Sequence, residues 1–495
     1  MQWPRASGIL VHPTSFPGRF GVGDLGPGAI SMLDFLHHAR QRMLQVLPLG
    51  PTGYGASPYA LLSAFAGNPL LISPERLLED DLLAPADLED ALVGREDRVD
   101  YEAVTPWKSA LLRASYARYE RCASATLRGE FAAFCAAQAG WLDEFALFMA
   151  LKDKHDGVAW TRWATPYARR DPEALAEARA TLAGEITFHR YTQFLFYRQW
   201  GALRKEAHKR GVSIIGDLAI FVAHDSADVW ANQRYFKLDR RGEPLVVAGV
   251  PPDYFSPTGQ RWGNPIYRWD ALAADSYAWW IARARHALEL ADIVRLDHFR
   301  GFEACWEIPG EKPTAEGGRW VVGPGAALFE AIQGALGATP VIAEDLGVIT
   351  PEVDALRERF GFPGIRVMQF GFDEGPKSPH LPHHASVNSV LYTGTHDNDT
   401  SAGWFAALKG RQRAYTLRYL DTDAAHVPMA MIRAAQASVA RLVIAPLQDV
   451  LGLGSEARMN FPSHTVGNWE WRCPERLLTD DVADQLAQLA TLYDR

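Results

Sequence analysis

Acidic side chains follow several short apolar runs of the sequence, at points where a strand would end. Asp217 ends the run VSIIGD, and Asp297, Glu344 and Asp397 follow DIVRL, PVIA and SVLYTGTH. Buried strands usually avoid carboxylates, because an isolated buried charge is costly. In a parallel barrel the C-terminal ends of the strands meet at one rim, which carries the active site. These four side chains are therefore candidates for one active site.

The segment RLDHF carries a candidate nucleophile. Arg295 and Asp297 are two residues apart on the expected strand, so their side chains leave the same face. A neighbouring guanidinium favours the ionised form of a carboxyl group, and a persistent carboxylate can attack an electrophilic carbon. An internal ion pair that only fills the barrel is the alternative interpretation.

Glu344 is a candidate proton donor. It follows Val341, Ile342 and Ala343, and apolar surroundings raise the pKa of a carboxyl group and keep it protonated. Enzymes that cleave glycosidic bonds use one ionised and one protonated carboxyl group, as expected here on neighbouring strands. The reaction retains configuration when the two groups lie about 5 to 5.5 Å apart. His396 and Asp397 are candidates for binding the sugar hydroxyls beside the reacting carbon.

The elements that must position these residues recur along the chain. Between most of the short apolar runs lie segments of helical periodicity, such as those that begin at Gly28 and Phe188. Alternating strands and helices predict a parallel sheet, and eight strands are the number of a closed (β/α)8 TIM barrel. The eight candidate strand segments are 8–16, 43–52, 212–222, 292–299, 340–348, 364–372, 389–397 and 440–453.

Two insertions account for the length of 495 residues, which we assign to a single catalytic barrel over 1–495. Residues 70–185 have helical periodicity and predict an inserted helical subdomain. Residues 223–273 are rich in Gly, Pro, Asp and aromatic side chains and predict an inserted active-site loop region, because long loops are often functional. Aromatic side chains there, such as Trp262 and Tyr267, are expected either to form platforms for a ligand or to anchor the loop.

Composition excludes several classes of protein. The formal net charge is −9, and no cluster of Lys and Arg provides the basic surface that nucleic acid or an anionic membrane requires. The four cysteines show no CxxC spacing, so we expect neither a disulfide framework nor a zinc site. The sequence shows no signal peptide and no stretch of about 18 apolar residues. We expect a cytoplasmic protein.

Two motifs resemble cofactor or metal sites without meeting their requirements. GVGDLG (21–26) fits GxGxxG, but the four residues 17–20 separate it from the preceding strand, and the next strand ends without an acidic residue. We interpret it as a turn shaped by glycine. HDNDT (396–400), with His383 and His384 nearby, lacks the spacing of a known metal motif. We expect no cofactor and no metal.

Longer segments extend these motifs over nearly the whole chain. They are SGILVHPTSFPGRFGVGDLG, QVLPLGPTGYGASPYA, IIGDLAIFVAHDSADVW, VAGVPPDYFSPTGQRWGNPIY, VRLDHFRGF, VIAEDLG, FPGIRVMQFGF and YTGTHDNDT. In these segments the sequence resembles the amylomaltases, the bacterial 4-α-glucanotransferases of glycoside hydrolase family seventy-seven. The resemblance implies an α-amylase-superfamily barrel with inserted subdomains and no separate C-terminal β-domain.

The resemblance also implies residue roles. It makes Asp297 the nucleophile, Glu344 the general acid/base and Asp397 the transition-state stabiliser. The residues that it assigns to substrate binding are Arg295, His396 and Asp217 beside the catalytic groups, Asp253, Gln260 and Trp262 on the loop over the site, Tyr59, Asn264, Phe370, Asp373 and Asn468 along a glucan groove, and Tyr54 and Tyr101 at a second glucan contact.

The implied reaction is transfer of part of an α-1,4-glucan to the 4-hydroxyl of an acceptor glucose or glucan, with cyclic products when the transfer is intramolecular. We expect the aromatic-rich loop over 247–269 to keep water from the intermediate and to hold the acceptor. An α-amylase-type hydrolase is the alternative on the same barrel, and a noncatalytic glucan-binding protein is a third. The expected partners are glucans, maltooligosaccharides and glucose, with a monomer or small homo-oligomer as the expected assembly.

Overall fold

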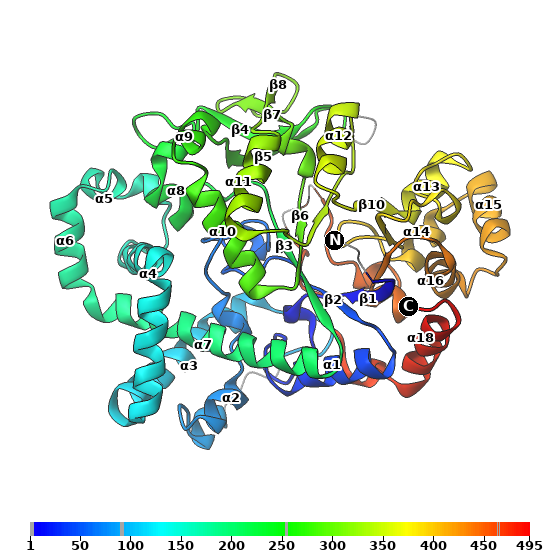
Figure 1. The fold of residues 1–495 in the computed structure, drawn as a ribbon. Helices are drawn as coiled ribbons and strands as arrows, with labels where there is room; N and C mark the ends of the chain where they lie inside the picture. Colours follow the sequence, from blue (N-terminus) through cyan, green and yellow to red (C-terminus); the bar gives the residue numbers. More distant parts are fainter. Residues whose placement is uncertain (1–3, 90–93, 253–255, 463, 465) are drawn as a thin grey trace.

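A closed barrel of eight parallel strands forms the centre of the molecule (Figure 1). The computed structural model describes residues 4–495 except 90–93, 253–255, 463 and 465. For Tyr54 it describes the backbone but not the side chain. The order around the barrel is β1-β12-β11-β10-β9-β6-β3-β2. The strands are β1 (Ala6–Leu10), β2 (Met43–Gln45), β3 (Ser213–Leu218), β6 (Ile293–Leu296), β9 (Val341–Ala343), β10 (Gly364–Val367), β11 (Ser389–Tyr392) and β12 (Leu442–Pro446).

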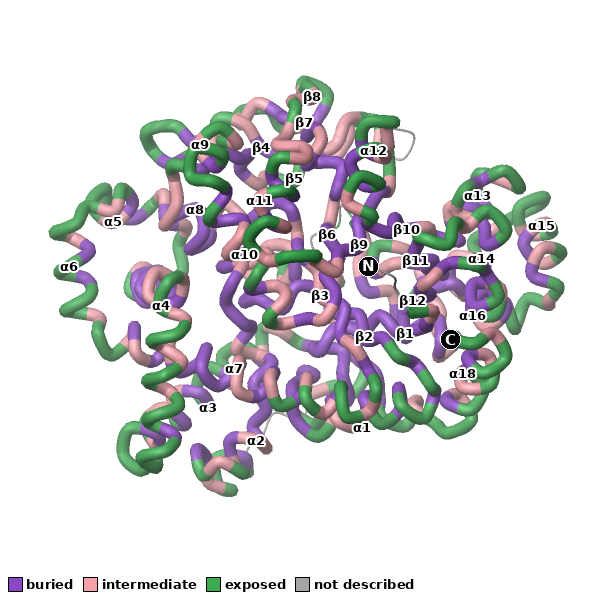
Figure 2. Tube along the Cα trace, in the orientation of Figure 1, coloured by how far each residue is buried: buried purple, intermediate pink, exposed green. Residues whose placement is uncertain are grey.

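Seven of the barrel strands lie inside their predicted segments, and β1 begins two residues before its segment, so the predicted fold class is confirmed. The strands are shorter than those segments, because the residues after each strand leave the hydrogen-bonded ladder and form the rim. Figure 2 shows the strands as the most completely buried part of the chain. Burial on both faces explains why they read as continuous apolar runs rather than as alternating patterns.

Helices surround the barrel. The predicted helices after β1 and before β3 and β6 are present as α1 (Pro27–His38), α7 (Ala183–Lys209) and α10 (Ala278–Leu290). The remaining helices of the outer layer are α11 (Ala326–Leu336), α12 (Pro351–Arg359), α13 (Met368–Glu374), α14 (Ser401–Ala407), α15 (Gly410–Leu420), α16 (Val427–Ala437), α17 (Leu447–Val450) and α18 (Asp480–Leu492). After β12 the described residues form helices and turns but no further strand.

The segment between β2 and β3 is helical. It contains α2 (Pro74–Glu79), α3 (Tyr101–Cys122), α4 (Ala125–Lys154), α5 (Thr165–Ala168) and α6 (Pro172–Thr181). Ser124 accepts a hydrogen bond from the Leu127 amide and so caps α4, which packs along α7. Figure 1 shows this helical group on one side of the barrel, opposite α13 to α16. Its description as a separate subdomain stays a prediction.

A second sheet lies over the barrel and was not predicted. Its four antiparallel strands run in the order β5-β4-β7-β8, with β4 (Val246–Val250), β5 (Gln260–Pro265), β7 (Ala304–Pro309) and β8 (Arg319–Val322). The region over 223–273, read as a loop, therefore holds a β-hairpin as well as α8 (Ala227–Ala231) and α9 (Trp269–Ala274). The sheet joins two strands that precede β6 in the sequence to two strands that follow it. The hydrophobic pattern within one segment does not show which distant strand it pairs with.

The GVGDLG segment is a turn packed against its neighbours. Gly21 has a φ of 74°, and a Cβ atom on Gly23 would lie 2.2 Å from the Pro13 carbonyl oxygen. Asp24 is buried, accepts a hydrogen bond from the Gly26 amide and pairs with Lys108 at 3.3 Å. These glycines therefore serve close packing of the backbone, as the sequence interpretation predicts.

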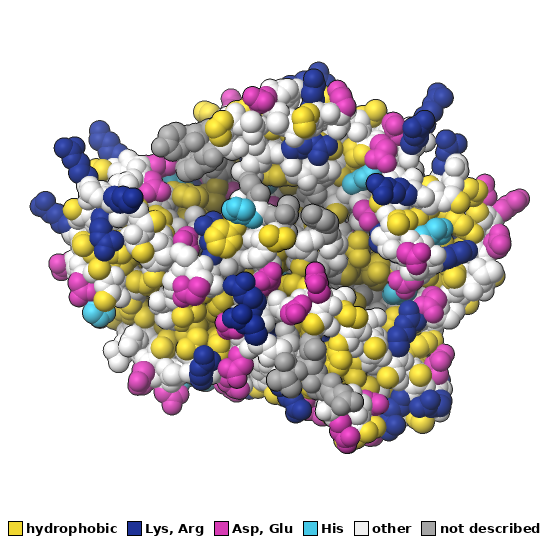
Figure 3. All heavy atoms as spheres, turned by 180° about the vertical axis from the view of Figure 1, so that it is seen from behind, with side chains coloured by type: hydrophobic (Ala, Val, Ile, Leu, Met, Phe, Trp, Pro, Cys, Tyr) yellow, Lys and Arg dark blue, Asp and Glu magenta, His cyan; other side chains and the backbone are white. Residues whose placement is uncertain are grey.

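On the face seen in Figure 3, Lys and Arg side chains are interspersed with Asp and Glu rather than gathered in one basic area. The four cysteines are unpaired. None of the helices in the part of the chain that the structure describes is both long and apolar enough to cross a membrane.

Candidate active site

Asp217 and Arg295 face each other because their strands pair in register. The β3–β6 ladder places Asp217 opposite Arg295, and the guanidinium contacts the Asp217 carboxylate at 2.6 Å and the Asp297 carboxylate at 3.0 Å. Arg295 therefore links two acidic groups of the rim. Because arginine stays protonated, it neutralises part of their negative charge and fixes the Asp297 carboxylate in direction.

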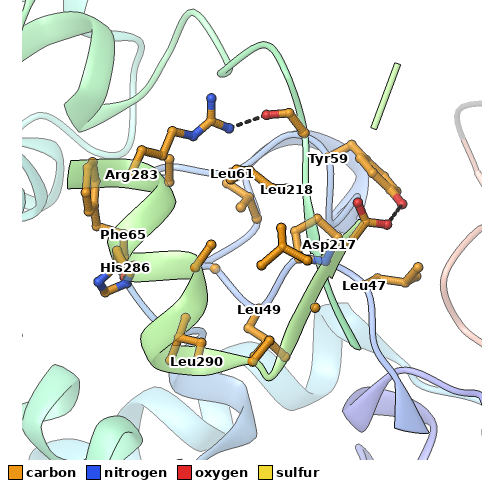
Figure 4. A pocket seen from close by; sticks show the side chains of 18 of the residues that line it. Leu47, Leu49, Tyr59, Leu61, Phe65, Asp217, Leu218, Arg283, His286 and Leu290 are labelled. Carbon is orange, nitrogen blue, oxygen red and sulfur yellow. Dashed lines mark hydrogen bonds between the residues drawn. The ribbon is translucent and has the colours of Figure 1, made fainter. Parts of the chain in front are cut away.

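Tyr59 completes this group from the loop that follows β2. Its hydroxyl donates a hydrogen bond of 2.8 Å to Asp217 (Figure 4). Burial, followed by the charge of Asp217, raises the pKa of Tyr59 well above its usual value, so the phenol stays a hydrogen-bond donor. Behind the pair a cavity of about 60 Å³, lined mainly by apolar side chains, separates the barrel from α10.

Glu344 lies beside Asp297 because of the next ladder. The β6–β9 register pairs Leu296 with Ala343, so the residues that follow these two on the neighbouring strands are Asp297 and Glu344. The Glu344 carboxyl group is buried and accepts hydrogen bonds from the amides of His298, at 2.6 Å, and Leu346, at 2.9 Å. Burial, reinforced by the charge of Asp297, raises the pKa of Glu344 to about 7.

This pKa predicts an alkaline limit of activity. A general acid must be protonated before it can donate, so the rate of bond cleavage should fall as pH rises through about 7. At lower pH Glu344 keeps its proton, so its titration does not reduce the rate. The pH profile of kcat/KM for a maltooligosaccharide donor measures this limit, since that parameter reports the free enzyme. A profile that stays flat from pH 6 to pH 9 would contradict the assignment.

Asp397 and His396 come from the loop that follows β11. One Asp397 carboxylate oxygen accepts a hydrogen bond of 2.6 Å from the Asn460 amide group, and the other lies 3.5 Å from the His396 ring. Arg458 donates to the backbone carbonyl of Asp397 at 2.7 Å. About half of the Asp397 side chain is exposed, 51%, against 27% for Asp297. Asp397 therefore offers carboxylate surface to a ligand.

The hairpin of β4 and β5 carries three of the predicted binding residues. Trp262 is 39% exposed, and its indole N–H donates to Gln260 at 3.1 Å. Asn264 donates to the Val222 carbonyl at 2.9 Å, which ties the hairpin to the loop after β3. Asp253 lies outside the described residues. Tyr267 is fully buried and donates to the Ile220 carbonyl, so this aromatic residue anchors the region instead of forming a platform.

The other predicted binding residues come from four further segments. Phe370 and Asp373 lie on α13, with Phe370 half-buried and Asp373 exposed. The side-chain oxygen of Asn468 accepts a hydrogen bond of 2.7 Å from the Phe461 backbone amide, within the same loop. Tyr101 donates to the Trp469 carbonyl at 2.8 Å, and the side chain of Tyr54 lies outside the described part of the chain. Their contacts with glucan stay predictions.

Sequence reasoning missed several side chains of the site. The Trp469 ring lies 6.1 Å from Tyr59 and 5.9 Å from His396, whose ring stacks on Tyr59 at 5.2 Å. His12 follows β1 and is buried, and burial lowers its pKa to about 3, with a further contribution from His396. Its position just after a strand end is the signal that could have drawn attention to it.

A match to the 4-alpha-glucanotransferase family covers residues 11–479. The chain belongs to this family. Family membership makes it an enzyme of glucan transfer, a class to which the paired carboxyl groups of the rim are suited.

Individual members of the family are similar to this chain over nearly its whole length. The chain is 52% identical to the 4-alpha-glucanotransferase of Thermus thermophilus, with 100% of each covered. It is 43% identical to the chloroplastic/amyloplastic 4-alpha-glucanotransferase of Solanum tuberosum, over 99% of this chain and 86% of the relative. The amylomaltase of Streptococcus agalactiae, solved in complex with acarbose, superposes with a TM-score of 0.96 at 38% identity, covering 99% of both chains.

Proposed function

We propose that this 4-alpha-glucanotransferase cuts an α-1,4-glucan and transfers the released segment to the 4-hydroxyl of an acceptor glucose or glucan, with retention of configuration. The observation that supports it most directly is the contrast between Asp297 and Glu344. Asp297 is tied to a guanidinium, whereas Glu344 is buried with a pKa of about 7. A carboxylate paired with arginine and a buried carboxyl group with a raised pKa, on one rim, suit nucleophilic and acid/base roles.

The first step forms a covalent intermediate. The Asp297 carboxylate attacks the anomeric carbon, the glycosidic bond breaks, and Glu344 gives its proton to the departing oxygen. Arg295 holds Asp297 in place during the attack, with Asp217 and Tyr59 completing the ion pair and hydrogen bond behind it. Asp397 and His396, which face the rim from the loop after β11, are suited to bind sugar hydroxyls more strongly as the oxocarbenium-like state develops.

The second step reverses the roles. Glu344, now ionised, takes the proton of the acceptor 4-hydroxyl while that oxygen attacks the anomeric carbon and the bond to Asp297 breaks. Water entering in place of the acceptor would give hydrolysis. The enzyme must therefore favour a bound sugar over water, and the hairpin that carries Gln260 and Trp262 is placed to supply acceptor contacts.

Product analysis on maltotriose tests this function against its alternatives. Transfer conserves the number of reducing ends and yields a ladder of oligomers longer than maltotriose together with glucose and maltose. An α-amylase-type hydrolase would raise the number of reducing ends and yield only shorter sugars. A noncatalytic glucan-binding protein would leave maltotriose unchanged. Chromatography of the oligomers combined with a reducing-end assay separates the three results.

The tip of the β4–β5 hairpin is predicted to favour transfer over hydrolysis. Val250 and Gln260 are directly paired, so residues 251–259 can be replaced by an Asn-Gly turn that suits a two-residue hairpin connection. We expect this variant to raise the ratio of hydrolysis to transfer from maltotriose, measured as new reducing ends relative to oligomers longer than maltotriose. The reason is that a shorter hairpin leaves the intermediate more open to water.

The shortened hairpin also loses Asp253, which needs a matched control. Asp253→Ala in the full-length hairpin separates the loss of this carboxylate from the loss of the covering segment. An unchanged ratio of hydrolysis to transfer in the shortened variant would refute the shielding role. A change of equal size in Asp253→Ala would assign the effect to the carboxylate alone.

The finer points of location and assembly rest on the sequence. We propose a cytoplasmic enzyme, supported by the four unpaired cysteines. A monomer or small homo-oligomer and action on free glucans and maltooligosaccharides complete the proposal. Light scattering of the purified enzyme measures the assembly.

A further inference from the structure

The residue after Asp297 has a backbone conformation that few side chains adopt. His298 lies in the left-handed region, with φ 49° and ψ 52°, where residues other than glycine pay a steric cost and asparagine is the usual exception. Such conformations persist where the surrounding structure imposes them, often at functional sites. This one turns the chain directly from β6 into a short 3₁₀ helix at Phe299–Phe302.

The two amides on either side of the left-handed turn both meet the candidate acid/base. The His298 N–H donates to one Glu344 carboxyl oxygen at 2.6 Å, and the next amide, of Phe299, donates to the Glu344 backbone carbonyl at 3.0 Å. The Leu346 amide donates to the other carboxyl oxygen at 2.9 Å. Both carboxyl oxygens of Glu344 are therefore held by backbone donors, and the conformation at residue 298 lets the His298 and Phe299 amides reach Glu344 together.

The ring of His298 has a different neighbour. It meets the Trp262 indole edge to face, with ring centroids 4.8 Å apart and planes at 87°. Among the described residues the His298 Nε2 atom is buried without a hydrogen-bond partner, and burial lowers the pKa of the ring to about 4, so it packs as a neutral aromatic group. A Cβ atom on Gly301 would lie 3.1 Å from the ring, so glycine there leaves room for it.

The partner of this ring, Trp262, is a partly exposed side chain. It lies on the hairpin over the barrel, is 39% exposed, and bonds through its indole N–H to Gln260 of the same hairpin. The imidazole is thus a contact between this exposed indole and the strand end that carries Asp297. Edge-to-face pairs of this kind contribute to the position of a ring beyond simple burial.

We propose that His298 is a positioning residue with two separable parts: its amide orients Glu344 for proton transfer, and its ring holds Trp262 where an acceptor sugar would stack. The proposal rests on the proposed transfer function and adds a determinant of the choice between sugar and water. The amide serves both chemical steps. The ring serves the site that holds first the departing segment and then the acceptor, and its loss should weigh most on the step in which acceptor and water compete.

Two substitutions separate the parts. His298→Gly removes the ring but adopts the left-handed conformation without strain and keeps the amide in place. His298→Ala also removes the ring, but its Cβ disfavours that conformation and loosens the amide. Transfer is measured as oligomers longer than maltotriose, and hydrolysis as new reducing ends. The pH profile of donor cleavage reports the contact with Glu344.

We expect His298→Gly to lower the ratio of transfer to hydrolysis about two- to tenfold, the range that an aromatic pair contributes, with total donor cleavage falling less than transfer and the alkaline limit unmoved. His298→Ala should lower donor cleavage further. It should also move the alkaline limit to higher pH, since weakening a hydrogen bond to the carboxylate raises its pKa.

A double-mutant cycle decides whether the ring acts through Trp262. In a Trp262→Ala background, His298→Gly should change the ratio no further, because the contact is already lost. An unchanged ratio in His298→Gly, or an equal change with and without Trp262, would overturn the ring's role. Identical pH limits in the Gly and Ala variants would overturn the amide's role. Wild-type enzyme that forms no longer oligomers would instead refute the proposed function. Melting curves of each variant verify folding.

Discussion

Replacing Asp297 by Asn should reduce both transfer and hydrolysis by at least about 10⁴-fold, the scale of loss seen when a covalent nucleophile is removed. The amide keeps the size of the side chain but has lost the charge that attacks the anomeric carbon and pairs with Arg295 at 3.0 Å. Oligomer formation and reducing ends from maltotriose measure the two activities.

The same variant should fail with an activated donor. An α-maltosyl fluoride supplies a leaving group that needs no protonation, so only the nucleophile limits the first step. We expect no burst of fluoride and no increase in protein mass with Asp297→Asn. A covalent adduct in this variant, or activity within tenfold of wild type, would show that another group attacks. Glu352→Gln, an exposed carboxyl group at the start of α12, is the matched control.

Replacing Glu344 by Gln should reduce transfer from maltotriose about 10²- to 10⁴-fold, the usual contribution of a general acid. The amide cannot donate a proton to the departing oxygen or accept one from the acceptor. It has nearly the same size, although its NH2 group replaces one of the two oxygens that accept from the backbone amides of His298 and Leu346.

The activated donor should separate the two steps in Glu344→Gln. Fluoride departs without an acid, so the first step is restored, but the second step still lacks its base. We therefore expect a burst of fluoride followed by accumulation of a glycosyl-enzyme whose mass exceeds that of the protein by one maltosyl group. If maltosyl fluoride is no better a donor than maltotriose for this variant, the acid role is wrong. The alkaline limit near pH 7 should also disappear.

Much of this architecture is readable from local sequence. All eight barrel strands overlap the short apolar runs, and Arg295 and Asp297 share a face because side chains alternate along a strand. The apolar residues before Glu344 predict the direction of its pKa shift, and burial with the charge of Asp297 raises that pKa to about 7. The strand positions and the direction of the shift can be predicted from neighbours in the chain.

Other features depend on contacts between distant segments. Strand β7 pairs with β4 of the hairpin, although β6 separates the two strands in the sequence. Because such pairing leaves no local periodicity, the sequence predicts a loop region over 223–273 and not a sheet. Tyr267 lies in the sequence among residues typical of loops, where it could be a platform or an anchor, and in the structure it is fully buried. Whether a ring is a platform or an anchor depends on what covers it, which sequence pattern does not contain.

The barrel, the family and the carboxyl groups at the strand ends can be predicted from the sequence, because hydrophobic runs and ordered motifs are local properties of the chain. Only the tertiary structure shows which groups surround those carboxyl groups: Asn460 on Asp397, Trp469 beside His396, and the left-handed His298 between Glu344 and Trp262. These neighbours are 36 to 73 residues apart in the sequence, and strand register with loop packing, rather than residue type, brings them together.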